Sequence, residues 1–311
     1  MNRLKDIFVI GDLIIDEDIV CDAVGLSLES PTLKCTHNNT EKRLGGSGNV
    51  VMNLSELNSR VGYMSICTDD DVKQILRKKN ISYFGLCTDK KTTVKQRYYV
   101  NRGDLSYKYM QINYSDNDPI ATETENDACL ILSEVLPNYQ AVIISDYKCG
   151  LLTEKLIKHI ISVCDDLLIP VIVNTQISDW GNKKTAAFDQ YVGCDLIVAN
   201  EQESKYINID SPYVTTLGAE GSKFVCKKRK ITVYSEGVKA DVKDTCGAGD
   251  AFTAMISTLP WKENIDKALY HANLWASKST EHIGASPPSF KKYKKCLKQL
   301  ELELNKEPVQ I

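Results

Sequence analysis

The sequence lacks the residue patterns of a zinc-binding, secreted or membrane-spanning protein. It has only 4 histidines, and its 11 cysteines are scattered without a Cys-x-x-Cys pair, which argues against a zinc site. No apolar run approaches the ~20 residues that cross a bilayer. The first residues, Met1 to Asp6, do not form a signal peptide. We therefore expect a cytoplasmic protein with reduced thiols and no membrane partner.

A basic excess is also absent. The net charge is −3 over 311 residues, so the chain lacks the cationic surface that nucleic-acid-binding proteins usually carry. The densest basic run, residues 227–230, lies between two β-like segments and is interpreted as a solvated hairpin tip. Hydrophobic residues make up 43% of the chain, which is enough for the core of one large domain or two small ones.

Short apolar runs alternate with segments of helical periodicity. The strand-like runs cover residues 7–10, 141–145, 171–173 and 196–199, and the helical segments include 50–57 and 156–161. This alternation predicts an α/β protein with a mostly parallel sheet covered by helices on both faces. Ligands of such proteins gather beyond the carboxyl ends of the strands. The polar residues that directly follow the strands are Gly11-Asp12, Asp146-Tyr147, Asn174 and Asn200.

One segment interrupts this alternation. Residues 92–112 show strand-like alternation on both sides of the turn Asn101-Arg102-Gly103-Asp104, which predicts a β-hairpin. Together with the polar segment 17–43, this hairpin would form a small sheet that lies over the site as a lid. An edge hairpin without a gating role is the alternative.

The most informative stretch is Asp244-Thr245-Cys246-Gly247-Ala248-Gly249-Asp250-Ala251-Phe252, where a polar loop turns into an apolar helix. Glycines allow close backbone approach, and free N–H groups at a helix start point at an anion. Gly247, Ala248 and Gly249 would form an anion hole, and Asp250 would take a proton from an attacking hydroxyl. The alternative is an acidic first turn that only stabilises the helix.

This nine-residue string resembles the signature of the ribokinase family, the PfkB-type carbohydrate kinases. Four further segments resemble family motifs in the same order: Gly11 to Asp16, Leu44 to Asn49, Asn200 to Glu203, and Val214 to Gly221. The resemblance implies a single ribokinase-like domain over residues 1–311, with three layers, a mostly parallel central sheet and a small β-sheet lid. It also implies an ATP-dependent sugar kinase in which Asp250 is the catalytic base.

The resemblance assigns roles to further residues. The acceptor sugar would contact Asp12, Asp16, Gly45, Gly46 and Asn49. An acceptor phosphate would be contacted by cations of the lid, among them Arg97, Arg102, Lys34 and Lys108, although exposed strand cations are the commoner explanation. The nucleotide would contact Asn200, Thr216, Gly218, Gly221 and Asn273. Glu203 would hold Mg²⁺ through water, and a monovalent cation is implied near Asp241.

Within the family, three stretches resemble the branch that phosphorylates the anomeric hydroxyl of D-glycero-D-manno-heptose 7-phosphate for ADP-heptose synthesis: Gly11 to Asp16, Leu28-Glu29-Ser30-Pro31 and Ser145-Asp146-Tyr147. The bifunctional form of that branch carries a nucleotidylyltransferase domain after the kinase, and a sequence that ends at Ile311 is expected to be the kinase alone.

Two departures from that branch leave other functions open. Lys148-Cys149 moves a lysine by one position, and Asn174-Thr175-Gln176 replaces an acid and a cation, which is expected to weaken phosphate handling. A kinase of another sugar or of a nucleoside, or a catalytically poor sugar- or nucleotide-binding relative, therefore remains an alternative. A homodimer through the lid is expected from its apolar side chains Val94, Tyr98, Val100, Tyr107 and Tyr109.

Overall fold

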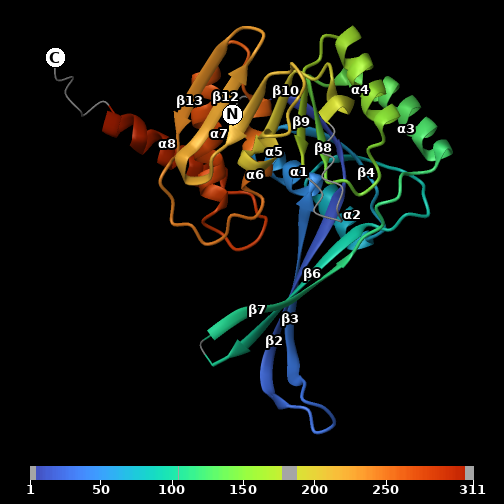
Figure 1. Ribbon diagram of the computed structural model, residues 1–311, viewed down its shortest axis with the longest axis vertical. Coiled ribbons are helices and arrows are strands. Elements are labelled where there is room, and N and C mark those ends of the chain that lie inside the picture. Colours follow the sequence, from blue (N-terminus) through green and yellow to red (C-terminus); the bar gives the residue numbers. More distant parts are fainter. Residues whose placement is uncertain (1–4, 104, 177–187, 305–311) are drawn as a thin grey trace.

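The computed structural model describes residues 5–103, 105–176 and 188–304. A layered body of helices around a central sheet carries a second, narrow sheet that extends away from it (Figure 1). Among the described residues, no helix is both long and apolar enough to cross a membrane.

The central sheet has nine strands in the order β13-β12-β11-β10-β9-β8-β1-β4-β5. Neighbouring strands in this order are parallel from β11 through β10, β9, β8, β1 and β4 to β5. At the other end, β12 and β13 add an antiparallel edge. The bounds are β1 Asp6–Gly11, β4 Arg60–Ser65, β5 Ser82–Gly85, β8 Ala141–Asp146, β9 Val171–Thr175, β10 Leu196–Asn200, β11 Tyr213–Thr216, β12 Gly221–Cys226 and β13 Ile231–Glu236.

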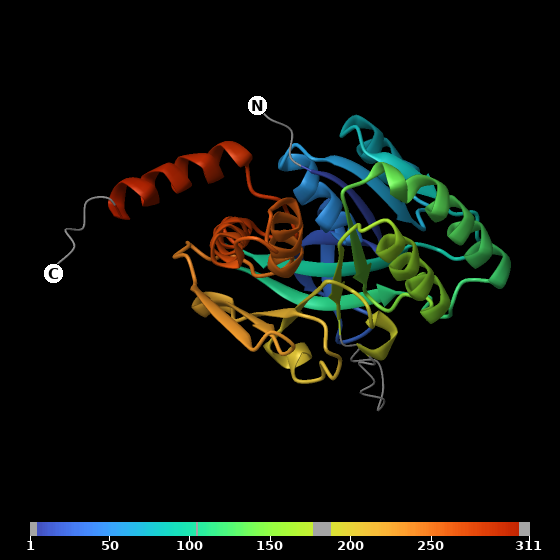
Figure 2. The same ribbon diagram turned by 90° about the horizontal axis from the view of Figure 1, so that it is seen from above.

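Helices cover both faces of this sheet because its strands are apolar on both sides. In β1, Ile7 and Val9 join one buried cluster, and Phe8 and Ile10 join the other. The first cluster includes α1 (Ser47–Glu56), α2 (Asp70–Lys78), α6 (Ala248–Thr258) and α7 (Ile265–Ser279), and the second includes α3 (Thr122–Val135) and α4 (Glu154–Asp166). The expected three-layer α/β fold is therefore confirmed. The remaining α5 (Glu201–Ser204) is a single turn, and α8 (Phe290–Leu304) projects from the body (Figure 2).

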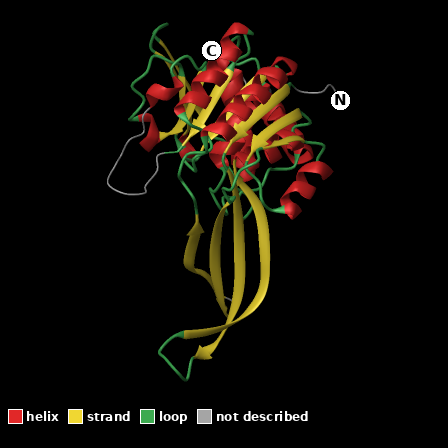
Figure 3. Ribbon diagram, turned by 90° about the vertical axis from the view of Figure 1, so that its right-hand side faces the viewer, coloured by secondary structure: helices red, strands yellow, loops and turns green. Residues whose placement is uncertain are grey.

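The small sheet contains four strands in the order β3-β2-β6-β7. Its strands are β2 Leu13–Leu26, β3 Leu33–Gly46, β6 Thr93–Arg102 and β7 Leu105–Tyr114. The expected hairpin within residues 92–112 is present, and segment 17–43 forms a second hairpin beside it, with β2 parallel to β6. Figure 3 shows these strands running out from below the helices. Because most of this sheet is solvent-exposed, its strands can be rich in polar residues.

The sheets meet at the carboxyl end of the central strands. β1 ends at Gly11, β2 starts at Leu13, and its first residues, Leu13 to Ile15, are buried in the body. β3 returns to the same place and leads directly into α1 at Ser47. The polar residues expected to gather after the strands therefore lie between the body and the base of the small sheet.

Candidate active site

The start of α6 has the geometry of an anion-binding turn. Gly247 is the N-cap residue, with φ 79° in the left-handed region, and a Cβ there would collide with Asn49 Nδ2. Ala248, Gly249 and Asp250 form the first turn, so their N–H groups have no partner within the helix, although Ala248 N donates to Thr245 O at 3.3 Å. The turn can thus receive a phosphoryl group on backbone donors and the helix dipole.

Asp250 lies in this first turn with its side chain buried, at 4% exposure. Its Oδ1 accepts hydrogen bonds from Tyr147 OH at 2.5 Å and Asn174 Nδ2 at 2.9 Å, and its Oδ2 accepts one from Asn49 Nδ2 at 2.9 Å. Burial raises the pKa of Asp250 to about 6, and the three donors oppose that rise. A carboxylate with a pKa near neutrality can accept a proton and release it within a catalytic cycle.

Two of these donors were not among the residues assigned to the site from sequence. Tyr147 follows β8, and Asn174 is the fourth residue of β9, so both lie at the carboxyl edge where polar residues were expected to gather. Asn174 was considered a loss, because it replaces an acid of the family pattern. Its amide nevertheless supplies a donor that a carboxylate could not, and this donor contacts the candidate base.

A pocket of about 630 Å³ opens in front of the turn. The nucleotide-site residues that line it are Asn200, Glu203, Thr216 and Gly218, together with Gly247 to Asp250. Two other residues assigned to the nucleotide lie elsewhere. Gly221 approaches the backbone of Ser235 on β13 too closely for a Cβ, and Asn273 donates to Ser235 O and Glu236 O. In the structure both hold β12, β13 and α7 together.

The donor set fits a hydrated magnesium ion better than a directly liganded one. Glu203 and Asn200 form a capping box at α5, in which Glu203 Oε2 accepts from Asn200 N at 2.9 Å. Both residues line the pocket, so this carboxylate lies beside the space for the phosphates. No group of three or more His, Cys, Asp or Glu side chains in the described part of the chain could hold a metal ion. Magnesium keeps several waters, which matches one carboxylate acting through water.

On the acceptor side, Asp16 lies at the base of the small sheet. Arg97 Nη1 contacts Asp16 Oδ1 at 2.8 Å, and a Cβ at Gly45 would collide with Asp16 Oδ2. Burial raises the pKa of Asp16, and Arg97 opposes this rise. Gly46 has φ 58° and lies against the backbone of Asp12, so it requires glycine. The structure therefore brings together the acceptor-site residues Asp16, Gly45, Gly46 and Arg97.

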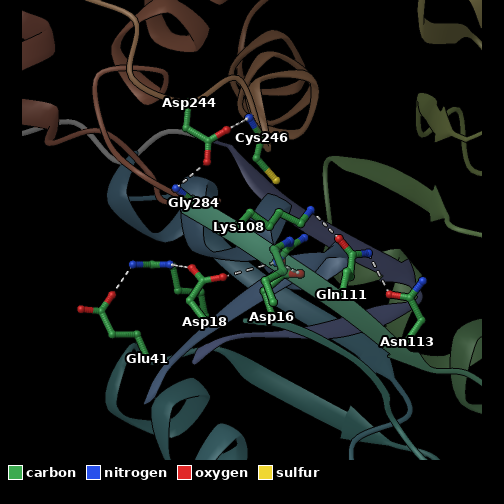
Figure 4. A network of polar contacts seen from close by, with 11 residues as sticks. Asp16, Asp18, Glu41, Lys108, Gln111, Asn113, Asp244, Cys246 and Gly284 are labelled. Carbon is green, nitrogen blue, oxygen red and sulfur yellow. Dashed lines mark hydrogen bonds and ion pairs between the residues drawn. The ribbon is translucent and has the colours of Figure 1, made fainter. Parts of the chain in front are cut away.

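A charge network continues beyond Asp16 (Figure 4). Arg43 forms ion pairs with both Asp18 and Glu41, and Asp18 Oδ1 lies 3.8 Å from Arg97 Nη1. This Oδ1 is buried and accepts no hydrogen bond. Asp18 was not assigned to the site, although its spacing of two residues from Asp16 on a strand places both on one face.

The other lid cations differ in position. Arg102 is exposed at the far end of its hairpin, opposite Leu105, and Lys34 is exposed near the far end of β3. Lys108 Nζ donates to Gln111 Oε1 at 2.7 Å. Lys95 was not singled out, yet it is half-buried beside Asp16 in the β2–β6 register. No ion pair of Lys95 is found within the described ranges.

Asp12 has a structural role in this geometry. Its Oδ2 accepts from Tyr147 N at 2.9 Å and Cys149 N at 3.1 Å, and its Oδ1 accepts from Leu151 N at 3.4 Å. Burial and the neighbouring Asp146 raise the pKa of Asp12. Its contacts thus hold the loop after β8, and its sugar contact stays a prediction.

The sequence and the fold are similar to those of known carbohydrate kinases. The model of the pfkB family carbohydrate kinases matches residues 4–292. The bifunctional protein HldE of Campylobacter jejuni subsp. jejuni serotype O:6 is 28% identical over 307 residues, which cover 93% of this chain and 64% of that protein. HldE of Aliarcobacter butzleri is 27% identical over 311 residues, or 92% of this chain and 63% of that protein. The chain thus spans less than two thirds of these relatives.

Solved structures support the fold. Phosphofructokinase-2 from Escherichia coli, in complex with potassium, has a TM-score of 0.69 at 16% identity, covering 96% of this chain and 100% of that one. Ribokinase from Giardia lamblia has a TM-score of 0.70 at 16% identity, covering 96% and 99%. With the family match extending over most of the sequence, the chain belongs to the pfkB family of carbohydrate kinases.

Proposed function

We propose that this carbohydrate kinase uses ATP to phosphorylate the anomeric hydroxyl of D-glycero-D-manno-heptose 7-phosphate. The observation that carries its catalytic part is the buried Asp250, which lies one residue after the glycine turn and faces a pocket. The heptose assignment rests on the resemblance of residues 28–31 and 145–147 to the heptose branch, and is supported by relatives named HldE.

In this proposal Asp250 takes the proton of the acceptor hydroxyl as that oxygen attacks the γ-phosphorus of ATP, and the bond from the γ-phosphorus to the bridging oxygen breaks to release ADP. The backbone N–H groups of Gly247, Ala248 and Gly249 stabilise the charge on the transferring group. Magnesium, held through water beside Asn200 and Glu203, would neutralise phosphate charge when bound. Asn49 donates to Asp250 Oδ2 and so keeps the base oriented beside the turn.

The phosphate of the acceptor requires a cation on the other side of the base. Arg97 already pairs with Asp16, and Arg43 pairs with Asp18 and Glu41. Lys95 lies on the same strand face as Arg97, and its ammonium group forms no ion pair in the described part of the chain, although its charge lowers the pKa of the facing Asp16. We therefore assign the first contact with the acceptor phosphate to Lys95, with Arg97 beside it.

The test is ADP release with Mg-ATP over a panel of heptose 7-phosphate, fructose phosphates, free hexoses, ribose and nucleosides. We expect turnover of the heptose phosphate, and an Asp250→Asn variant that folds and binds ATP should lose about 10²–10⁴-fold in kcat. Wild-type turnover by Asp250→Asn contradicts the mechanism. Turnover of a different acceptor would change the substrate assignment and would be compatible with the proposed mechanism.

The absence of ADP release with every acceptor in the panel has a separate meaning. If the folded protein is stabilised by ATP or a sugar but releases no ADP, either the acceptor lies outside the panel or the chain is the catalytically poor binding relative, and the heptose assignment fails in both cases.

A further inference from the structure

The candidate base is held by neutral donors. Asp250 accepts three hydrogen bonds, from Tyr147, Asn174 and Asn49, and none of its contacts within the described ranges is to a lysine or arginine. The Tyr147 contact is the shortest of the three, at 2.5 Å. A neutral donor stabilises a carboxylate without the fixed charge that would suppress its basicity altogether.

Tyr147 is itself fixed by its loop. Asp12 accepts from the N–H groups of Tyr147, Cys149 and Leu151, so one buried carboxylate ties three points of a five-residue segment. Lys148 has φ 59° in the left-handed region, and its N–H donates to Asp146 Oδ1 at 2.8 Å. The loop is therefore bound to Asp12, which directly follows β1, and to Asp146 at the end of β8.

We infer that Tyr147 is a positioning residue that orients Asp250 and keeps it ionised, and that Asp12 acts through the loop to hold Tyr147 in place. This inference rests on the proposed role of Asp250 as the base. Nothing in it requires Asp12 to touch the sugar, since both of its oxygens already accept backbone donors.

The sign of the expected effect follows from the contacts. The Tyr147 hydroxyl donates to the charged form of Asp250 and so lowers its pKa, against the rise caused by burial. The titratable groups that face Asp250 from the surrounding elements are Tyr147, Asp16 from β2 and Cys246 from the loop before α6. Asp16 acts in the opposite direction to Tyr147 and raises the pKa of Asp250.

The first experiment is the pH profile of kcat/KM for Tyr147→Phe, which keeps the ring and removes the donor. The acid limb should move to higher pH by about one unit, because the base loses a donor to its ionised form. The ratio of wild-type to variant activity should therefore grow by up to about tenfold between pH 8.5 and pH 6. An acid limb that stays in place or moves to lower pH overturns the inference.

Tyr191→Phe is the matched control. Tyr191 is buried where Tyr147 is partly exposed, and its hydroxyl donates to a buried aspartate, Asp146, at the same distance of 2.5 Å. Its hydroxyl contacts Asp146 and Lys148 Nζ but not Asp250, so its removal disturbs the same loop without taking a donor from the base, and should leave the acid limb where it is in the wild type. An equal shift in both variants would show a general effect of the mutations and would also overturn the inference.

Asp12→Asn distinguishes the two possible roles of Asp12, which are holding the loop and contacting the sugar. A positioning role predicts a fall in kcat with little change in the KM of the acceptor, and faster hydrogen exchange at the amides of Tyr147, Cys149 and Leu151 in the ligand-free protein. A direct sugar contact predicts a raised KM instead, with the exchange of these amides unchanged. The second pattern would remove Asp12 from the inference.

A direct titration keeps the inference distinct from the proposed function. The ¹³C shift of the Asp250 carboxyl, assigned with Asp250→Asn, reports its pKa in the ligand-free protein. Tyr147→Phe should raise this pKa whether or not any acceptor in the panel is turned over. A raised pKa in a protein without kinase activity would refute the proposed function alone, and an unchanged pKa would refute the positioning by Tyr147.

Discussion

The two sides of the site are built in different ways. On the donor side, the proposed anion hole is a run of consecutive backbone groups, Gly247 to Asp250, at the start of one helix. On the acceptor side, charges come from three strands of the small sheet, with Asp16 on β2, Arg43 on β3, and Lys95 and Arg97 on β6. The donor side therefore depends on local conformation, and the acceptor side depends on strand register.

The sharpest way to test the donor side is a pair of glycine substitutions. Gly247→Ala places a methyl group against Asn49 at a residue with φ 79°, so it should destabilise the protein by ~1–2 kcal/mol and displace the turn. Loss of aligned donors at such a turn is expected to lower kcat by about 10²-fold. Thermal unfolding and kcat measured on the same preparation give both quantities.

Gly249→Ala is the counterpart. Apart from its chain neighbours and the nearby backbone of its own helix, no heavy atom lies within 4 Å of a Cβ at Gly249, which is helical and lines the pocket, so alanine should leave the stability unchanged or slightly higher. Its methyl group would nevertheless occupy the space of the phosphates, and we expect kcat to fall by more than about tenfold. Wild-type turnover by this variant would contradict close approach of the ligand to the backbone.

On the acceptor side the expected effect is on KM. Lys95→Ala should raise the KM of a sugar phosphate by about tenfold, because it removes a charge-assisted contact, and should leave the KM of ATP unchanged. Arg102→Ala is the control, since Arg102 is exposed at the hairpin end. Acceptor titrations at saturating ATP measure both. An equal effect on an unphosphorylated sugar would show that Lys95 does not bind the phosphate.

This difference between the sides also explains what could be predicted from the sequence. The central strands can be predicted because they are apolar on both faces, and the glycine turn before α6 can be predicted because all of its parts are consecutive in the chain. The small sheet was expected from the alternation in 92–112, and its partner 17–43 from polar composition. Local patterns carry all of this information.

The remaining features depend on non-local pairing. Periodicity places Arg97 and Lys95 on one strand face, but only the pairing of β2 with β6 brings Asp16 to Arg97 and leaves Lys95 without a carboxylate partner. Arg102 lies far from the site because it is at the hairpin end. The Tyr147 contact with Asp250 joins residues 103 positions apart, so no local pattern could show it.

The smallest effect on activity is expected from the outer part of the small sheet, through which we propose a homodimer. Leu105 and Tyr107 on the edge strand β7 are 73% and 45% exposed, whereas Val100, also expected at the interface, is already buried within one chain. Exposed apolar residues on an edge strand favour association with a second copy. Leu105→Ser combined with Tyr107→Ser should therefore shift the protein from dimer to monomer in light scattering.

The turnover of this double variant should stay within about threefold of the wild type, because neither side chain lines the pocket. Loss of the second chain would change only how the small sheet closes over the site. Tyr234→Ser, at a tyrosine of β13 that is 65% exposed, is the control and should not change the mass. A wild-type protein that is monomeric at micromolar concentration contradicts the dimer. A monomeric variant that loses most of its turnover would mean that the acceptor side, unlike the donor side, is completed by the second chain.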